Sequence, residues 1–212
     1  MSDLEHLANA IDPRGKTVVD IGCGDGAFVR ALAAAGADAI GIEVSEDAVA
    51  QARANDPDRR YELGGAERLP LEDASIDVAT LMRSLHHVPD PASAFPELAR
   101  VVREHVWIAE PLPEGAFFEL LRPVDDETEV RAAAQRAIAE QQDFARVETV
   151  EYEIRIPVGS FEALRERLLA ADPTRAARFT EAEPQLRALF TPGEYVERVR
   201  AELLGVPSRR TL

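Results

Sequence analysis

The part of the chain that most constrains its fold is residues 18–29, which read VVDIGCGDGAFV. An apolar β-branched run, glycine at every second position and then apolar residues at helical spacing predict a strand, a tight turn and a helix. Glycines let such a turn bend sharply and let a ligand approach the backbone, so we expect Gly22 and Gly24 to lie under a ligand. The helix that follows directs free N–H groups at the same place, which favours a negative group such as a carboxylate. The motif therefore predicts an α/β sheet with a nucleotide-like ligand at its edge.

Two carboxylates accompany this turn. Asp20 lies two residues before Gly22, where an acid repels a pyrophosphate and attracts an ammonium group. Glu43 ends a second predicted strand, residues 38–43, 21 positions after Gly22. An acid at the tip of the second strand can accept hydrogen bonds from both hydroxyls of a ribose. The ligand is therefore expected to carry a cation and a ribose.

Composition restricts the class of protein. The 212 residues are 46% hydrophobic and 30% charged, as in a globular domain. No apolar run approaches the roughly 20 residues of a membrane span, and the first five residues lack the basic start of a signal peptide, so we expect a cytoplasmic protein without membrane contact. The net charge of −15 repels phosphate backbones and disfavours nucleic acid as a partner.

The cysteine and the paired histidines each allow more than one role. Cys23 is the only cysteine, which excludes a disulfide within the chain and a cysteine-based zinc cluster. We interpret it as a small residue in contact with the ligand rather than as a nucleophile. His86 and His87 suggest a metal pair or a general base, but neighbours in sequence rarely face one metal ion. We therefore predict no metal, with His86 facing the pocket and the other ring packed structurally.

Further motifs follow in a characteristic order: GGAERLPL at residues 64–71, SIDVA at 75–79 and LHHV at 85–88. Together with the glycine turn, they resemble the class I S-adenosylmethionine-dependent methyltransferases over residues 14–110. The pattern is most similar to the small-molecule group that contains ubiquinone and menaquinone C-methyltransferases. The resemblance implies a Rossmann-like fold, with a mostly parallel seven-stranded sheet flanked by helices. It also implies S-adenosylmethionine as cofactor and methyl transfer to a small-molecule acceptor.

By this resemblance, Asp20 neutralises the methionine ammonium of the cofactor and Glu43 holds its ribose hydroxyls. The cofactor-binding residues implied are Asp20, Gly22, Cys23, Gly24, Glu43, Val44, Ala66, Glu67 and Arg83. The family usually has Asp directly before the Ala that lies beside the adenine, and its carboxylate takes the exocyclic amine. Here that position is Gly65, which leaves the amine to the Ala66 backbone, to Glu67 or to a bridging water. A solvated surface acid is an equal alternative for Glu67. If a base is needed, the candidates are His86, Glu110 and Tyr152, in that order.

The organisation of the chain is expected to be simple. No internal repeat or linker is visible, which favours one domain over residues 1–212 with a helical insertion at about 158–190. Residues 191–197 have the cap, proline and acid of a helix start, whereas the architecture of the resembled family requires a last antiparallel strand there. Strand and helix both stay open for residues 193–204.

Two other classes of function account for parts of the sequence. A nicotinamide-dependent oxidoreductase usually has Gly-x-Gly-x-x-Gly, whereas the third glycine here, Gly26, comes one position early, and Asp20 would oppose a pyrophosphate. A non-catalytic S-adenosylmethionine-binding protein, or the partner subunit of a methyltransferase, is a closer alternative that Gly65 keeps open. The complete glycine and ribose motifs favour the enzyme.

Overall fold

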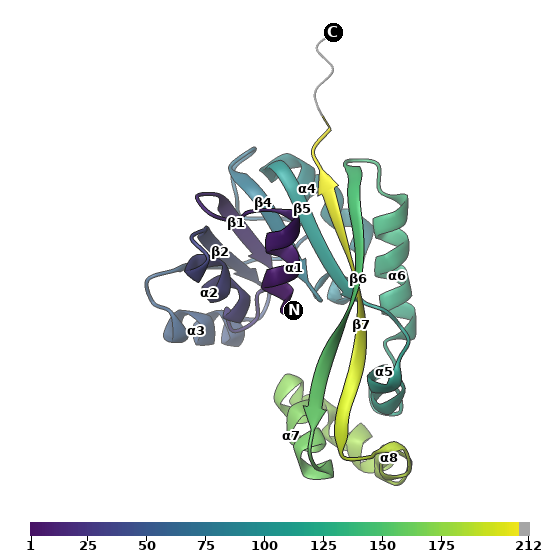
Figure 1. Cartoon of the computed structure of the whole chain (residues 1–212). Coiled ribbons are helices and arrows are strands. Elements are labelled where there is room, and N and C mark those ends of the chain that lie inside the picture. The colour runs from purple at the N-terminus through teal and green to yellow at the C-terminus, as the bar shows by residue number, and fades with distance from the viewer. Residues whose placement is uncertain (208–212) are drawn as a thin grey trace. The chain divides into compact units, whose positions relative to one another are not determined.

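The structure is a computed structural model in which residues 1–207 are described, except for the side chain of residue 171. Within this range, one seven-stranded sheet has the strand order β3-β2-β1-β4-β5-β7-β6 (Figure 1). The strands are β1 (Thr17–Ile21), β2 (Asp38–Glu43), β3 (Arg60–Leu63), β4 (Ile76–Met82), β5 (Val102–Pro111), β6 (Ala145–Val158) and β7 (Gly193–Gly205). The α-helices are α1 (Asp3–Ala10), α2 (Ala27–Ala34), α3 (Glu46–Asn55), α4 (Ala94–Val101), α5 (Ala116–Leu121), α6 (Thr128–Glu140), α7 (Phe161–Ala171) and α8 (Ala176–Leu189). Short 3₁₀ turns lie at Leu85–His87, Pro91–Ser93 and Pro173–Arg175.

The alternation of strands and helices confirms the predicted fold class. The strand pairs β1·β2, β1·β4, β2·β3 and β4·β5 are all parallel. Parallel neighbours need a crossover connection, and α2, α3 and α4 supply those crossovers. Because parallel strands end at one edge of the sheet, the residues that follow β1, β2 and β4 come together there. Among the described residues, no helix has the length and apolar character needed to cross a bilayer.

The chain divides into two compact units, each with its own core. The first unit comprises Met1–Glu110, Ala133–Val150 and the segment that begins at Arg200. The second comprises Pro111–Ala132 and Glu151–Val199, and it includes the whole of α7 and α8. Only the first unit contains the glycine turn and the motifs around it, so the candidate site is described within that unit.

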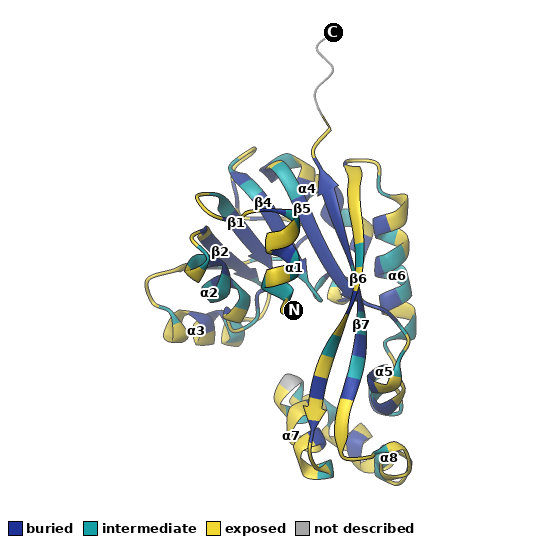
Figure 2. Ribbon diagram, in the orientation of Figure 1, coloured by how far each residue is buried: buried dark blue, intermediate teal, exposed yellow. Residues whose placement is uncertain are grey.

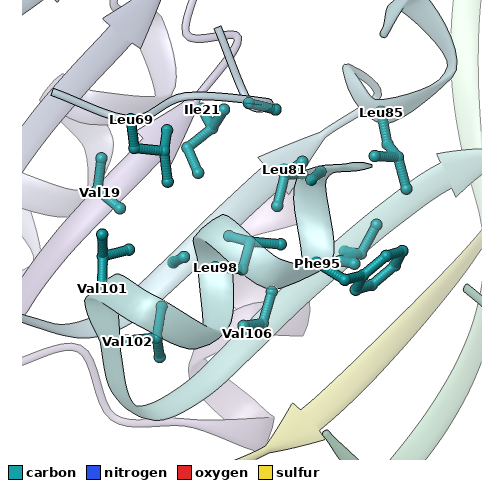
Figure 3. Packing of buried hydrophobic residues seen from close by; sticks show 14 of the residues in the cluster. Val19, Ile21, Leu69, Leu81, Leu85, Phe95, Leu98, Val101, Val102 and Val106 are labelled. Carbon is teal, nitrogen blue, oxygen red and sulfur yellow. The ribbon is translucent and has the colours of Figure 1, made fainter. Parts of the chain in front are cut away.

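A large part of the core of the first unit lies between the sheet and α4. Figure 3 shows Phe95, Leu98 and Val101 of α4 packed against strand residues such as Leu81 and Val106. Phe95 and Leu98 are at most 1% exposed, and burying an apolar side chain of this size stabilises the fold by roughly 1.5–3 kcal/mol. β5 is buried along most of its length (Figure 2), as expected of a strand covered on both faces. This packing holds the ends of β1 and β4 in place.

The second unit has an aromatic core. The ring of Phe161 lies 5.6 Å from the ring centroids of both Phe179 and Phe190, and Tyr195 packs in the same cluster. Ser160 caps α7 by accepting a hydrogen bond from the backbone of Ala163, as its position before the helix predicts. The cluster joins α7, α8 and the start of β7 within this unit.

The open assignment of residues 193–204 is resolved in favour of a strand, since β7 spans Gly193–Gly205. Alternate side chains, those of Tyr195, Glu197 and Val199, are buried, and this period of two suits a strand. The predicted cap residue Thr191 is used differently, because its backbone exchanges two hydrogen bonds with the hydroxyl of Tyr195. Tertiary packing therefore overrides the local helix signal.

One arginine fastens the loop between β3 and β4. All five N–H groups of Arg100 in α4 donate hydrogen bonds, and the acceptors are the carboxylates of Glu97 and Asp73 and the carbonyls of Leu69 and Leu71. Glu97 also accepts the backbone N–H of Leu69. The Arg100 guanidinium lowers the pKa of Glu97 to about 2, so this pairing stabilises the fold above pH 4 and is lost as the pH falls towards 2.

We expect Arg100→Lys to lower the free energy of unfolding by about 1–2 kcal/mol, because an ammonium group cannot reach both carbonyls and both carboxylates at once. Urea unfolding at pH 7 measures the change. The matched control is Arg103→Lys, which alters a half-exposed arginine bonded to Asp77 and should cost less than about 1 kcal/mol. Equal losses in the two variants would contradict the role given to Arg100.

Candidate active site

A cavity of about 640 Å³ opens at the carboxyl ends of β1, β2 and β4. Its size falls in the range of small-molecule sites, and it lies where open parallel sheets bind ligands. The lining residues are Ile21, Gly22, Glu43, Val44, Gly64, Gly65, Ala66, Glu67, Leu81, Arg83, Ser84, His87, Val88 and Pro89. The predicted site is thus a hollow lined by apolar side chains with several charged groups.

The turn after β1 needs its glycines. Gly22 lines the cavity in the left-handed region, at φ +75°, and a Cβ there would overlap the Cβ of Ser84. Gly24 has φ +54°, and a Cβ there would meet nothing within 4 Å, so its backbone is open on that side. Only glycine adopts these conformations without strain. Gly24 is not among the cavity-lining residues, but it is held by Glu43, which is one of them.

Glu43 ties the glycine turn to the end of β2. One carboxylate oxygen accepts the backbone N–H of Gly24 at 2.9 Å, and the other accepts those of Val44 and Ser45 at 2.9 and 3.1 Å. Hydrogen bonds to an ionised acceptor are the stronger kind. The side chain is half-buried and lines the cavity, and its carboxylate has capacity to accept further hydrogen bonds from a ligand with hydroxyl groups.

Asp20 lies beneath the turn rather than in the cavity wall. The residue is 2% exposed, and its Oδ1 accepts a hydrogen bond from the Thr80 hydroxyl at 2.8 Å. Burial raises the pKa of Asp20 to about 7, although Thr80 and the charge of Arg83 act in the opposite direction. Burial removes the water that would stabilise the charged carboxylate, so a cation in the cavity would favour the ionised form of Asp20.

Cys23 lies inside the turn and is buried. The residue is 7% exposed, and its thiol packs close to Gly41, where a Cβ would come within 2.7 Å of the sulfur. Burial raises the pKa of the Cys23 thiol to about 12, so the thiolate needed for nucleophilic attack is absent at neutral pH. This agrees with the expectation that Cys23 is not a nucleophile. Its side chain is not among those that line the cavity.

Arg83 follows β4 and lines the cavity. Its backbone is left-handed, at φ 57°, which is uncommon for a side chain of this size. The guanidinium donates a hydrogen bond to Asp3 of α1 at 2.7 Å, and the neighbouring Ser84 hydroxyl donates one to the carbonyl of Ile21. These contacts tie the segment after β4 to α1 and to the end of β1.

The loop after β3 shows what replaces a side chain at Gly65. A Cβ at this position would lie 2.8 Å from the Oε2 of Glu67 and 3.4 Å from a methyl group of Val44. The Glu67 carboxylate therefore lies over the glycine at the cavity wall. Val44 is 70% exposed and Ala66 is buried, and both line the cavity beside it. The result is an apolar slot with a carboxylate at its edge.

The two histidines lie opposite to the prediction, because His87 lines the cavity whereas His86 is buried. His86 places Nδ1 2.5 Å from a carboxylate oxygen of Glu110, which is itself 0% exposed and also accepts the Leu85 N–H. A buried carboxylate requires such partners, and they turn His86 inward. The rings of His86 and His87 are in contact, with centroids 4.0 Å apart.

The structure therefore brings together most of the residues that the sequence indicated. Gly22, Glu43, Val44, Ala66, Glu67 and Arg83 line the cavity, whereas Asp20, Cys23, Gly24 and His86 lie behind that lining. Sequence reasoning did not single out Leu81, Val88 and Pro89, which line it as well. Val88 and Pro89 directly follow the paired histidines, so the turn that contains them was the available signal.

The segment that contains the cavity is similar to known methyltransferases. A family model described as "Methyltransferase domain" matches residues 19–109, which contain every lining residue of the cavity. The ubiquinone biosynthesis O-methyltransferase of Thiobacillus denitrificans is 40% identical over 103 residues, which are 44% of this chain and 43% of that protein. The corresponding enzyme of Hydrogenovibrio crunogenus is 37% identical over 110 residues, which are 50% of this chain and 46% of that protein. The chain therefore spans less than half the length of these curated relatives.

Solved structures show the same fold over nearly the whole chain. A putative methyltransferase of Bacillus halodurans superposes with a TM-score of 0.67 at 19% identity, over 98% of this chain and 100% of that one. The YcgJ protein of Bacillus subtilis gives 0.66 at 18% identity, over 97% and 98% of the two chains. These neighbours confirm the Rossmann-like fold. The match to a methyltransferase domain thus falls on residues 19–109, the part of the chain that contains the cavity.

Proposed function

We propose that this protein transfers a methyl group from S-adenosylmethionine to a small-molecule acceptor. The observation that carries the proposal is the cavity beside the glycine turn, with Glu43 at its wall and Asp20 beneath it. We further propose that residues 1–212 act as one methyltransferase domain with α7 and α8 as an insertion, and that the protein works in the cytoplasm.

The residues present suit the cofactor. S-adenosylmethionine carries a ribose, a purine and a charged amino-acid part. The cavity wall has a carboxylate for the hydroxyls in Glu43, an apolar slot at Val44 and Ala66 and a guanidinium in Arg83, and Asp20 lies buried behind this wall. Its volume of about 640 Å³ leaves room for such a ligand. In this proposal the backbone of Gly22 and Gly24 passes beneath the ligand.

The residues act mainly by orienting the reactants. When bound, the cofactor supplies a methyl group already activated by its sulfonium. A site that aligns two reactants can remove about 7–11 kcal/mol of the barrier, so a strong acid or base is optional. If the acceptor must lose a proton, we propose His87 as the group that faces it, with His86 and Glu110 held behind its ring. Tyr152 of β6 is buried in the second unit and stays a prediction.

The acceptor is proposed to be a small organic molecule. The names of the curated relatives specify O-methylation, which makes phenols and other hydroxyl compounds the first acceptors to try. The net charge of −15 disfavours nucleic acid. A panel of small hydroxyl, amine, thiol and activated-carbon acceptors, with S-adenosylhomocysteine release as the readout, tests transfer. Cofactor binding without release from any acceptor would favour the non-catalytic alternative.

We expect Glu43→Ala to weaken the binding of S-adenosylhomocysteine at least tenfold, or about 1.4 kcal/mol, because the ribose loses its acceptor and the Gly24 amide loses its anchor. Calorimetry on wild type and variant measures the change. The matched control is Glu46→Ala, since Glu46 is an exposed acid in the first turn of α3 and should leave affinity unchanged. If wild type is folded and does not bind the ligand, the proposed function is wrong.

We expect Asp20 to make stability depend on pH. Its carboxyl keeps a proton up to about pH 7 in the folded chain but ionises near pH 4 when unfolded, so the folded state binds more protons in between. Its contribution therefore falls as the pH rises from 4 to 7, by about 2–4 kcal/mol. Urea unfolding of wild type and Asp20→Asn at several pH values gives the difference. A difference that is flat across this window would contradict the buried, protonated carboxyl.

We expect Glu67 to select for an amino group on the purine. Wild type should bind S-adenosylhomocysteine more tightly than its analogue with a 6-oxo group, and Glu67→Ala should lose about fivefold to tenfold of that preference. Adding Gly65→Asp to Glu67→Ala should restore it, because the φ of Gly65 lies outside the left-handed region and its Cβ would then meet only a methyl group of Val44 at 3.4 Å. Calorimetry with both ligands measures the ratio. A preference that survives in Glu67→Ala would assign recognition to the backbone of Ala66.

A further inference from the structure

A row of side chains crosses one face of the sheet just below the cavity. In the register of the parallel strands, Tyr61 pairs with Gly41, Gly41 with Asp20, Asp20 with Thr80, and Thr80 with Trp107. Paired residues on neighbouring strands point to the same face. Asp20 and Thr80 are thus fixed as neighbours by β1 and β4 themselves rather than by a flexible loop.

The hydroxyl of Thr80 is fully buried and has two possible acceptors. It lies 2.8 Å from the Oδ1 of Asp20 and 3.3 Å from the carbonyl oxygen of Val19. Within the described part of the chain, no other hydrogen bond to the Asp20 carboxylate is found. One carboxylate oxygen is therefore occupied by Thr80, and Oδ2 is left for a different partner.

A hydroxyl at this place can serve both forms of the carboxyl group. When Asp20 is ionised, Thr80 donates its proton to Oδ1. When Asp20 is protonated, its O–H can donate to the Thr80 oxygen, and Thr80 then donates to the carbonyl of Val19. Only the first arrangement presents a negative charge to a cation, and the hydrogen bond from Thr80 favours that form.

We propose that Thr80 is a positioning residue for the cofactor: its hydroxyl orients the Asp20 carboxylate and holds it in the charged form that attracts the ligand's ammonium group. The inference rests on the proposed function and extends it to a buried residue that does not line the cavity. Nothing in the identity of Thr80 marks it as functional in the sequence, because threonine is common in strands.

The other charged groups around Asp20 are few. Arg83, after β4, favours the ionised carboxylate, and Glu43, at the end of β2, opposes it. Cys23 in the turn is neutral at physiological pH, since its pKa is raised to about 12. Arg83 is also bonded to Asp3, so part of its charge is compensated. Among the residues that the structure describes, Thr80 supplies the hydrogen bond to the carboxylate, and its loss should not be replaced by these neighbours.

A purely structural role for Thr80 would change ligand affinity with pH in a different way. If the hydroxyl only satisfied a buried backbone carbonyl, its removal would lower stability and reduce ligand affinity by one factor at every pH. A positioning role through Asp20 makes the loss of affinity depend on pH, because the ionised form is recovered at high pH without the help of Thr80. The pH profile separates the two roles.

The experiment measures S-adenosylhomocysteine affinity by calorimetry at pH 6, 7 and 8.5 for wild type, Thr80→Val and Thr80→Ser. Valine keeps the shape and removes the hydroxyl, whereas serine keeps the hydroxyl. We expect Thr80→Val to bind about fivefold more weakly at pH 7, more weakly still at pH 6, and within about twofold of wild type at pH 8.5. Thr80→Ser should follow the wild-type profile within about twofold at each pH.

Controls keep the outcomes distinct. Circular dichroism and thermal unfolding confirm that each variant is folded, and Thr80→Ala replaces Thr80→Val if the latter is not. In the Asp20→Asn background, removing the Thr80 hydroxyl should no longer change the pH profile. If Thr80→Val loses affinity by the same factor at every pH, or loses none, the inference is wrong. Binding by wild type in that case would still support the proposed cofactor. If wild type itself does not bind S-adenosylhomocysteine, the proposed function fails first.

Discussion

The hydrogen bonds between Glu43 and three backbone amides are the interaction on which the site depends. They join the turn after β1 to the start of α3, so two segments that approach a ligand from different strands share one carboxylate. The parallel register of β1 and β2 brings the two segments within reach, and the buried core beneath keeps that register in place. Replacing the carboxylate leaves these amides without their partner and the turn without its anchor.

The charges near the turn are arranged by depth. Glu43 lies at the cavity wall, where it is partly hydrated, while Asp20 is buried below it and has its pKa raised to about 7. The difference follows from the strand pattern: Asp20 is an interior residue of β1, and Glu43 is the last residue of β2. Two acids of similar chemistry therefore lie in different surroundings, one at the cavity wall and one in the interior.

Much of this could be read from the sequence because the relevant signals are local. Glycine spacing and the apolar runs predict the strand, turn and helix that become β1 and α2, and the second strand, residues 38–43, which is β2. The orientation of His86 and His87 could not be predicted from the sequence, because it depends on Glu110, which lies 24 residues from His86. This buried carboxylate needs hydrogen-bond donors, and His86 turns inward to meet it. The same holds for β7, where long-range packing overrides the proline and acid of a helix start.

Arg83 has a consequence for how the chain tolerates change. Its left-handed backbone, at φ 57°, costs roughly 1–2 kcal/mol for most residues and considerably less for glycine or asparagine. A substitution at this position can therefore fail for two separate reasons. The new residue can disfavour the left-handed backbone, or it can lack the guanidinium group. Valine, isoleucine and threonine strongly disfavour the left-handed backbone. Loss of stability or function in such a variant would therefore reflect the geometry of the turn and not the loss of the positive charge.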